Sequence, residues 1–181
     1  MKRYLIAAIV FTVFAVPAMA QGGSVEVFGG YSYFRANVVE GANLDGWNVS
    51  VTGRITDWLG IVGDFGGHYG SPNAFVFGPA RNLDTRVHSF LFGPRLYANY
   101  GGISPYVHAL FGAARSSTDT FADTISDAAF AMALGGGVDL NLNRSFAIRL
   151  FQADYFPTRF FDERQDNTRI STGIVFRFRV E

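Results

Sequence analysis

Apolar side chains alternate with small, polar or basic ones along eight separate segments of this chain. Successive side chains of a β-strand point to opposite faces, so a period of two predicts strands that lie between two different environments. In the last segment Ile170, Ile174 and Phe176 share one face. Arg169 and Arg177 share the opposite face. The pattern predicts an all-β protein in which each strand has one apolar face.

Each segment is about 11 residues long, which matches a tilted transmembrane β-strand. The segments cover residues 24–34, 44–55, 59–69, 86–98, 105–115, 128–142, 145–156 and 168–178. The connections after the first, third, fifth and seventh segments are long, and the others are short. Short periplasmic turns and longer extracellular loops are typical of outer-membrane barrels. The chain is therefore expected to fold as an eight-stranded antiparallel up-and-down transmembrane β-barrel, with both termini on the periplasmic side.

The first 20 residues are expected to be a cleaved signal peptide. Lys2 and Arg3 form a basic start, residues 4–16 are apolar, and an Ala-Met-Ala motif ends at Ala20. The apolar run is too short for a transmembrane helix, which needs about 20 residues. Residues 21–181 would then form the mature chain, a single outer-membrane barrel domain.

The mature chain has no cysteine, so disulfides cannot stabilise it and a large core or a bilayer must do so. Without Lys2 and Arg3 the chain has 13 basic and 15 acidic residues, or about two net negative charges. This near-neutral balance argues against nucleic acid as a partner. The sequence contains 19 phenylalanines and 21 glycines, which favours an all-β fold with many turns.

A soluble lipocalin-like barrel is the competing architecture, because its apolar face also alternates but points inward. Here the other face carries Gly, Ala, Ser and isolated charges, whereas a water-exposed face usually carries Lys and Glu. Aromatic residues near the strand ends could form the two interfacial girdles of a membrane barrel. These residues are Tyr31, Tyr33, Trp47, Trp58, Tyr100, Tyr106 and Phe178. The sequence therefore favours the outer membrane.

If the apolar faces meet lipid, seven ionisable residues point into the barrel. They are Glu26, Arg54, Asp64, Arg95, His108, Asp139 and Arg177. An eight-stranded barrel is just wide enough for side chains to fill it, and buried charges must be paired. The first interpretation is a polar plug that fixes strand register. A narrow ion or proton path is the second, and no wide pore is expected.

The seventh segment does not keep a single phase. Arg149 has the opposite parity from Gln152 and Asp154, so a regular strand cannot turn all three inward. Either a β-bulge shifts the phase, or one of these side chains extends to the membrane interface.

No catalytic or metal site is expected from the sequence. Asp64, His68 and Ser71 lie close together in the chain, but a separation of four residues in a strand is about 13 Å. His88 and His108 have no partners at metal-ligand spacing. We therefore expect no cofactor and no enzymatic activity, with an enzyme that modifies outer-membrane lipid as the alternative.

Two apolar patches lie in predicted extracellular connections. One contains Phe75 and Phe77, and the other contains Phe160 and Phe161. Such patches could contact a host protein or lipopolysaccharide. They make a surface-interaction role, including adhesion, the functional expectation.

Four stretches together resemble the OmpA-like outer-membrane β-barrel family: 29–35, 92–95, 105–112 and 134–139. The resemblance implies an eight-stranded barrel in the cell outer membrane, surrounded by lipid and lipopolysaccharide and expected to be monomeric. It also implies insertion by the outer-membrane assembly machinery, which recognises a C-terminal strand that ends in an aromatic residue.

Phe176 and Phe178 would supply this assembly signal, although Arg179, Val180 and Glu181 follow them. The peptidoglycan-binding domain of full-length OmpA proteins has no counterpart here, so cell-wall anchoring is not expected. Lipid A deacylases form another class of barrels, with a His and a Ser near the C-terminal strands. No histidine follows His108, so the chain does not match them.

Overall fold

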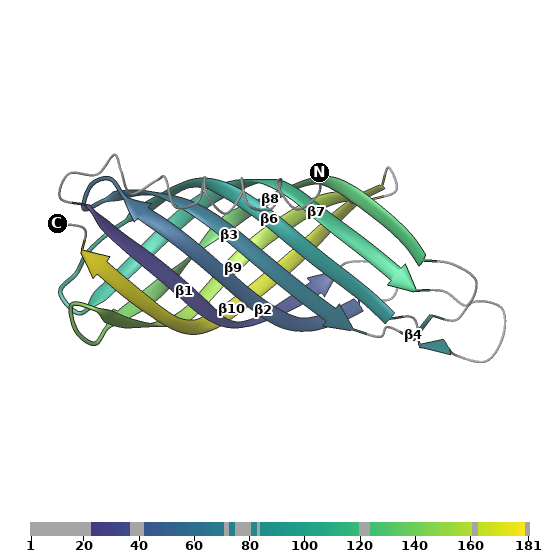
Figure 1. Cartoon of the computed structure of the whole chain (residues 1–181), viewed down its shortest axis with the longest axis horizontal. Helices are drawn as coiled ribbons and strands as arrows, with labels where there is room; N and C mark the ends of the chain where they lie inside the picture. Colours follow the sequence, from purple (N-terminus) through teal and green to yellow (C-terminus); the bar gives the residue numbers. More distant parts are fainter. Residues whose placement is uncertain are drawn as a thin grey trace, which may run out of the picture.

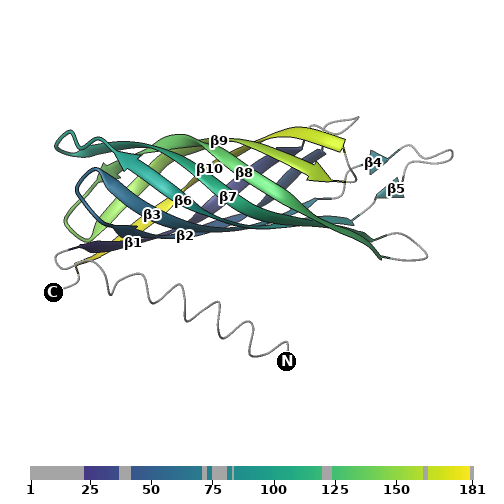
Figure 2. The ribbon, with the colours of Figure 1, turned by 90° about the horizontal axis from the view of Figure 1, so that it is seen from above.

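A computed structural model describes residues 23–36, 42–70, 73–74, 81–82, 84–119, 124–160 and 163–179. Eight tilted strands close into one antiparallel barrel (Figures 1 and 2). They are β1 (Ser24–Ala36), β2 (Ala42–Arg54), β3 (Leu59–Gly70), β6 (Asp84–Tyr97), β7 (Ile103–Asp119), β8 (Thr124–Asn141), β9 (Phe146–Phe160) and β10 (Glu163–Arg179). Neighbours in the chain pair in sequence, and β10 closes the barrel against β1.

The two ends of the barrel differ. At the left of Figure 1, β10 ends near the short turns 55–58, 98–102 and 142–145. At the other end, β4 (Asn73–Ala74) and β5 (Arg81–Asn82) form a separate two-stranded ladder beyond the barrel strands. Short turns mark the periplasmic end of an outer-membrane barrel, so the β4–β5 end is the extracellular one. No helix among the described residues has the length and hydropathy needed to cross a membrane.

Residues 116–127 and 157–167 are predicted as loops, but the structure places most of them in strands, so this prediction is wrong. β7 and β8 stay paired out to Asp119 and Thr124, and β9 and β10 continue to pair beyond Pro157. The reason is that neighbouring strands can satisfy each other's backbone groups outside the membrane as well as within it. Polar composition here marks contact with water rather than the end of a strand.

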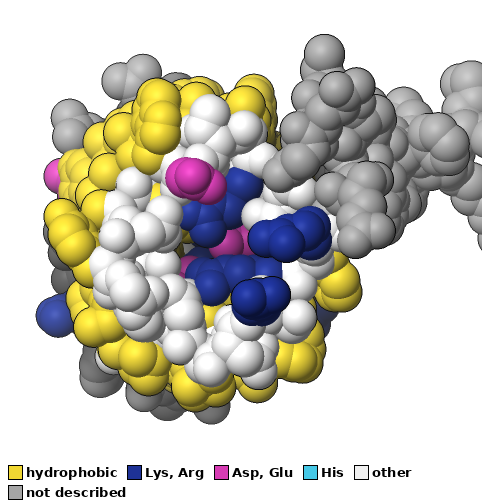
Figure 3. All heavy atoms as spheres, turned by 90° about the vertical axis from the view of Figure 1, so that its left-hand side faces the viewer, with side chains coloured by type: hydrophobic (Ala, Val, Ile, Leu, Met, Phe, Trp, Pro, Cys, Tyr) yellow, Lys and Arg dark blue, Asp and Glu magenta, His cyan; other side chains and the backbone are white. Residues whose placement is uncertain are grey.

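Large apolar side chains cover the outside of the barrel. In the end view of Figure 3, hydrophobic atoms surround a polar centre. The exposed side chains come from every strand of the barrel; examples are Tyr31, Val49, Ile61, Phe92, Phe111, Phe130, Ile148 and Ile174. Water-soluble monomers rarely expose a continuous apolar surface of this kind, whereas a bilayer requires one.

The phase change in the seventh predicted segment is a β-bulge in β9. Leu150 and Phe151 are consecutive, yet 49% and 50% of their surfaces are exposed on the outside. Arg149 and Gln152, on either side of them, are fully buried. The pairing register shifts here against both β8 and β10. One extra residue therefore lets inward-facing groups precede and follow two lipid-facing ones.

Deletion of Leu150 is expected to destabilise the barrel, because it would remove the bulge and turn Arg149 toward lipid. An arginine on the lipid face costs about 2–4 kcal/mol at the bilayer midplane and less near the interface. We expect the free energy of unfolding in vesicles, measured by urea titration, to fall by about 2 kcal/mol. Leu150→Ala keeps the residue count and should lose less than half as much. Equal losses would contradict this role of the bulge.

Candidate functional site

The outer half of the barrel interior contains an apolar cluster. A cluster of buried side chains extends from Leu91 and Leu110, in the middle of their strands, to Phe34 and Leu44 near the outer ends of β1 and β2. Phe34 packs edge-on against Phe156, with ring centroids 5.3 Å apart. The predicted polar plug therefore occupies only part of the interior. The apolar part was not foreseen, because Leu91 and Phe34 have inward parity but carry no charge.

All seven ionisable residues predicted to point inward lie inside the barrel. Glu26, Asp64, Arg95, His108 and Asp139 are buried. Arg54 and Arg177, nearer the periplasmic end, retain 14% and 12% side-chain exposure. Sequence reasoning missed further members of the buried set. They are His68, Arg149, Gln152, Asp154 and Arg169.

A central network joins four strands around Arg169. Its Nη1 donates to Asp64 Oδ1 at 2.7 Å, and its Nη2 and Nε donate to Asp154 Oδ2 at 2.7 and 2.9 Å. His108 Nε2 lies 2.8 Å from the other Asp154 oxygen. All four side chains are shielded from solvent. Charged hydrogen bonds of this kind fix the positions of β3, β7, β9 and β10 relative to one another.

A second network, around Arg149, lies nearer the periplasmic end. Arg149 Nε and Nη2 donate to the two Asp139 oxygens at 2.9 and 3.3 Å. Arg149 Nη1 and the Tyr106 hydroxyl both donate to Gln152 Oε1 at 2.8 Å. Tyr106 is therefore buried inside the barrel, and its prediction as a residue of an interfacial girdle is wrong. The guanidinium also stacks on the Phe28 ring, 4.1 Å from its centroid. The β9 bulge is what brings Arg149 and Gln152 to the same interior site.

Glu26 is the centre of a third network at the strand pair that closes the barrel. It lies directly across from Arg177 in the β1–β10 register, and Arg177 Nε donates to it at 2.8 Å. Arg54 Nη1 donates at 3.1 Å and the Tyr97 hydroxyl at 2.8 Å. One carboxylate thus links β1 to β2, β6 and β10.

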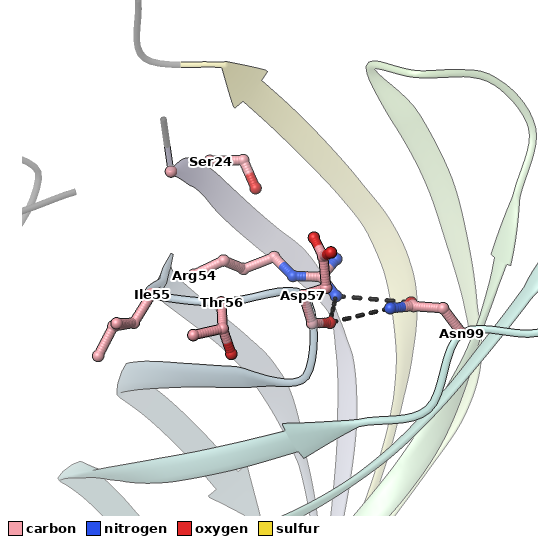
Figure 4. Close-up of a pocket in the computed structure, with 7 residues that line it drawn as sticks. Ser24, Arg54, Ile55, Thr56, Asp57 and Asn99 are labelled. Atoms are coloured by element: carbon pink, nitrogen blue, oxygen red, sulfur yellow. Dashed lines mark hydrogen bonds between the residues drawn. The ribbon is translucent and has the colours of Figure 1, made fainter. Parts of the chain in front are cut away.

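A polar pocket opens at the periplasmic end and has a volume of about 430 Å³. Its lining residues are Gly23, Ser24, Arg54, Ile55, Thr56, Asp57 and Asn99 (Figure 4). Arg54 Nη2 donates to the Asp57 carbonyl at 2.7 Å, and Asn99 Nδ2 donates to the same oxygen at 2.9 Å. Figure 3 shows basic side chains gathered in the hollow centre of this end. We call this pocket, together with the side chains of Glu26, Arg95 and Arg177 that lie deeper in the barrel interior, the periplasmic vestibule.

Two of the residues considered for catalysis, Asp64 and His68, are buried inside the barrel. His68 Nε2 lies 2.8 Å from Ser32 Oγ, but both side chains are buried in the interior. Asp64 binds Arg169, and His68 Nδ1 has no hydrogen-bond partner among the described residues. Ser71 lies outside the described residues. Within the described ranges, no group of three or more possible metal ligands comes together.

The predicted assembly and contact residues are only partly described. Phe176 and Phe178 are exposed on the outer face, and Phe176 packs against Phe146 with ring centroids 5.0 Å apart. β10 ends at Arg179, and Val180 and Glu181 lie outside the described residues. Phe75, Phe77 and Phe161 also lie outside them. Phe160 is the last residue of β9.

Comparisons with known proteins agree with this architecture. Residues 6–178 match a family described as the outer membrane protein beta-barrel domain. Ail, the attachment invasion locus protein of Yersinia pestis, is 20% identical with a TM-score of 0.62, over 87% of this chain and 100% of that one. Neisserial surface protein A is 13% identical with a TM-score of 0.69, over 88% and 100%.

A major outer membrane protein from Thermus thermophilus is 11% identical with a TM-score of 0.51, over 86% of this chain and 99% of that one. At such low identities these structures share the fold, and they say nothing further about individual residues. No curated protein sequence matches the chain.

Proposed function

We propose that this chain, which belongs to the outer membrane protein β-barrel family, is a non-enzymatic structural and surface-interaction protein. The barrel lies in the outer membrane, where lipid surrounds its apolar belt. The observation that supports this proposal is that side chains fill the barrel interior. A barrel without an open path through it can interact with other molecules only at its two ends and its lipid-facing surface. The extracellular end offers the larger surface.

The apolar cluster in the outer half argues against conduction. An ion that entered from the periplasm would meet Leu91, Leu110 and Phe156 before it reached the outside. Loss of hydration there is costly, and an apolar constriction excludes water. The buried ion pairs around Arg169 narrow the remaining path further. We therefore expect no conductance steps in planar bilayers.

The extracellular strand ends support a contact role. β7 and β8 have 17 and 18 residues, whereas about 9–11 residues cross a bilayer. Because the periplasmic turns are short, the excess length extends outward. Arg86 and Arg115 are exposed near these outer ends, and Arg115 donates a hydrogen bond to Ser126 Oγ at 3.1 Å. Phe75 and Phe77 lie outside the described residues, and apolar contact through them stays a prediction.

An anionic surface polymer is the partner class that best fits exposed arginines. Among proteins of this fold, Ail has been solved with the heparin analogue sucrose octasulfate. Guanidinium groups bind sulfate and phosphate oxygens in a bidentate manner, and lipopolysaccharide carries such phosphates. Adhesion through these residues is part of the proposal.

The test measures binding of cells that display the chain to immobilised heparin. Arg86→Gln/Arg115→Gln should lower binding several-fold, and binding by the wild type should weaken as salt rises. Phe75→Ser/Phe77→Ser tests the apolar contact separately. Arg144→Gln, at an exposed periplasmic turn, is the matched control and should bind like the wild type.

Two outcomes would contradict the proposed function. One is equal heparin binding by wild type and both outer variants. The other is a changed acyl pattern of lipid A, measured by mass spectrometry with and without expression, which would instead support the lipid-modifying enzyme.

A further inference from the structure

Positive charge is in excess in the periplasmic half of the described interior. Around the centre, Arg169 faces two carboxylates, Asp64 and Asp154. Nearer the periplasm, four arginines face two carboxylates, Glu26 and Asp139. These arginines are Arg54, Arg95, Arg149 and Arg177. A buried charge without a counter-charge is costly, so this half of the barrel requires additional negative charge.

Of these four arginines, Arg95 is the one for which the described residues supply no carboxylate in contact. Its surface is 0% exposed. Its Nη1 lies 3.5 Å from Thr52 Oγ1 and its Nη2 3.3 Å from His108 Nδ1, both long for charged hydrogen bonds. Its Nε is buried without a hydrogen-bond partner. The guanidinium stacks on Tyr106, 4.3 Å from the ring centroid, which holds its plane but does not neutralise its charge.

His108 cannot supply the missing negative charge. If its Nδ1 accepts from Arg95, its proton is on Nε2, which then donates to Asp154. The ring is neutral in this arrangement, and Asp154 already accepts two bonds from Arg169. Arg95 therefore lacks a full counter-charge within its contacts.

Arg177 is the second incompletely bound guanidinium. Its Nε donates to Glu26 and its Nη1 to Asn141, but its Nη2 is buried without a partner among the described residues. Arg54 shares the same Glu26 carboxylate. One carboxylate thus serves two arginines at the mouth of the vestibule.

Solvent reaches this region from one side. The 430 Å³ pocket beside Arg54 opens at the periplasmic end, where Figure 3 shows the basic side chains in a hollow. A water molecule occupies about 30 Å³ in the liquid, so the pocket can hold a small anion with several waters. A cleft of one charge sign with low-dielectric walls also concentrates counter-ions. Phospholipid headgroups, by contrast, lie outside the barrel wall.

We propose that the periplasmic vestibule binds a small inorganic oxyanion from the periplasm, with Arg54 as the arginine that lines the pocket and with the incompletely compensated charge of Arg95 and Arg177 behind it in the barrel interior. An oxyanion such as phosphate can accept from the Arg54 guanidinium, and the two unpartnered N–H groups of Arg95 and Arg177 leave positive charge behind it that attracts an anion. Binding would complete the charge balance next to the β1–β10 closing pair. The site is separate from the extracellular contact surface.

The experiment measures phosphate binding by calorimetry, with the full barrel in zwitterionic nanodiscs at constant ionic strength. Arg95→Gln removes the uncompensated charge and should raise the dissociation constant for phosphate at least tenfold. Arg144→Gln should leave it unchanged, because that arginine is exposed outside the vestibule. Nanodiscs with anionic phospholipid form a second arm: if a headgroup rather than free phosphate were the ligand, they would abolish phosphate binding.

A variant with an added negative charge provides a second test in case Arg95→Gln does not fold. Thr52→Asp places a carboxylate beside Arg95, since Thr52 Oγ1 already lies near its Nη1. This variant should melt at a higher temperature without phosphate, and added phosphate should no longer raise its melting temperature. Equal phosphate affinity in wild type, Arg95→Gln and Thr52→Asp would overturn the proposal. So would an equal loss in Arg144→Gln, which would indicate general charge screening.

Discussion

Replacement of Gly30 by valine should prevent the barrel from closing. Gly30 lies directly across from Gly173 in the β1–β10 pair. A Cβ atom on Gly30 would lie 2.0 Å from the Thr172 carbonyl oxygen and 2.8 Å from the Gly173 Cα. Both are backbone atoms, so no side-chain rotation can relieve the overlap. The first and last strands would have to separate. Their edges, which closure of the barrel normally pairs, would then be left with unpaired backbone groups.

Gly29→Val is a matched control because it differs by one position and faces the other side. A Cβ at Gly29 meets nothing within 4 Å, and its direction is toward lipid. Folded outer-membrane barrels migrate differently on gels before and after boiling. Gly30→Val should lose the faster, unboiled form almost completely, whereas Gly29→Val should retain it. Normal yields of folded Gly30→Val would show that the closing strands can move apart without losing their pairing.

Arg169→Met should produce the largest loss of stability among the interior substitutions. Methionine fills a similar volume, but Asp64 and Asp154 would lose their shared counter-charge while remaining buried. Breaking a buried ion pair by removing one partner typically costs about 3–5 kcal/mol. The expected result is a decrease of that size in the free energy of unfolding, measured by urea titration in lipid vesicles.

The companion variants distinguish lost pairing from lost packing. Arg115→Met changes an exposed arginine and should cost less than about 1 kcal/mol. In the double variant Arg169→Met/Asp64→Asn, one of the two carboxylates left without a counter-charge is replaced by a neutral amide. Part of the lost free energy of unfolding should therefore be recovered. If the double variant is less stable than Arg169→Met, removal of charge cannot be the cause of the effect.

The alternation of residues along the sequence was enough to predict which segments form strands and which side chains point into the barrel. Outside the seventh segment, the period of two predicted which residues point inward, including Glu26 and Arg177, and the barrel has eight strands in the expected order. Arg169 could have been found by the same rule, because it shares its parity with Arg177. The loop predictions failed at 116–127 and 157–167, since polarity reports contact with water and not backbone pairing.

Arg149 shows where local pattern stops being sufficient. Its parity conflicts with Gln152 and Asp154, which indicates an irregularity but does not distinguish a bulge from a side chain that reaches the interface. The pairing with β8 and β10 resolves this, because both neighbours shift register at Leu150 and Phe151. A bulge is a property of paired strands, so it becomes visible when the partners are known.

The chain's alternation and segment lengths were enough to establish strands, their lipid-facing sides and an eight-stranded barrel, because these follow from local geometry and the thickness of a bilayer. Which charges meet inside depended on closure. Asp64 and Arg169 are 105 positions apart, and Glu26 and Arg177 are 151 apart. Strand tilt and register bring such residues together across the interior. The same long-range geometry leaves Arg95 without a carboxylate and makes the periplasmic vestibule positive.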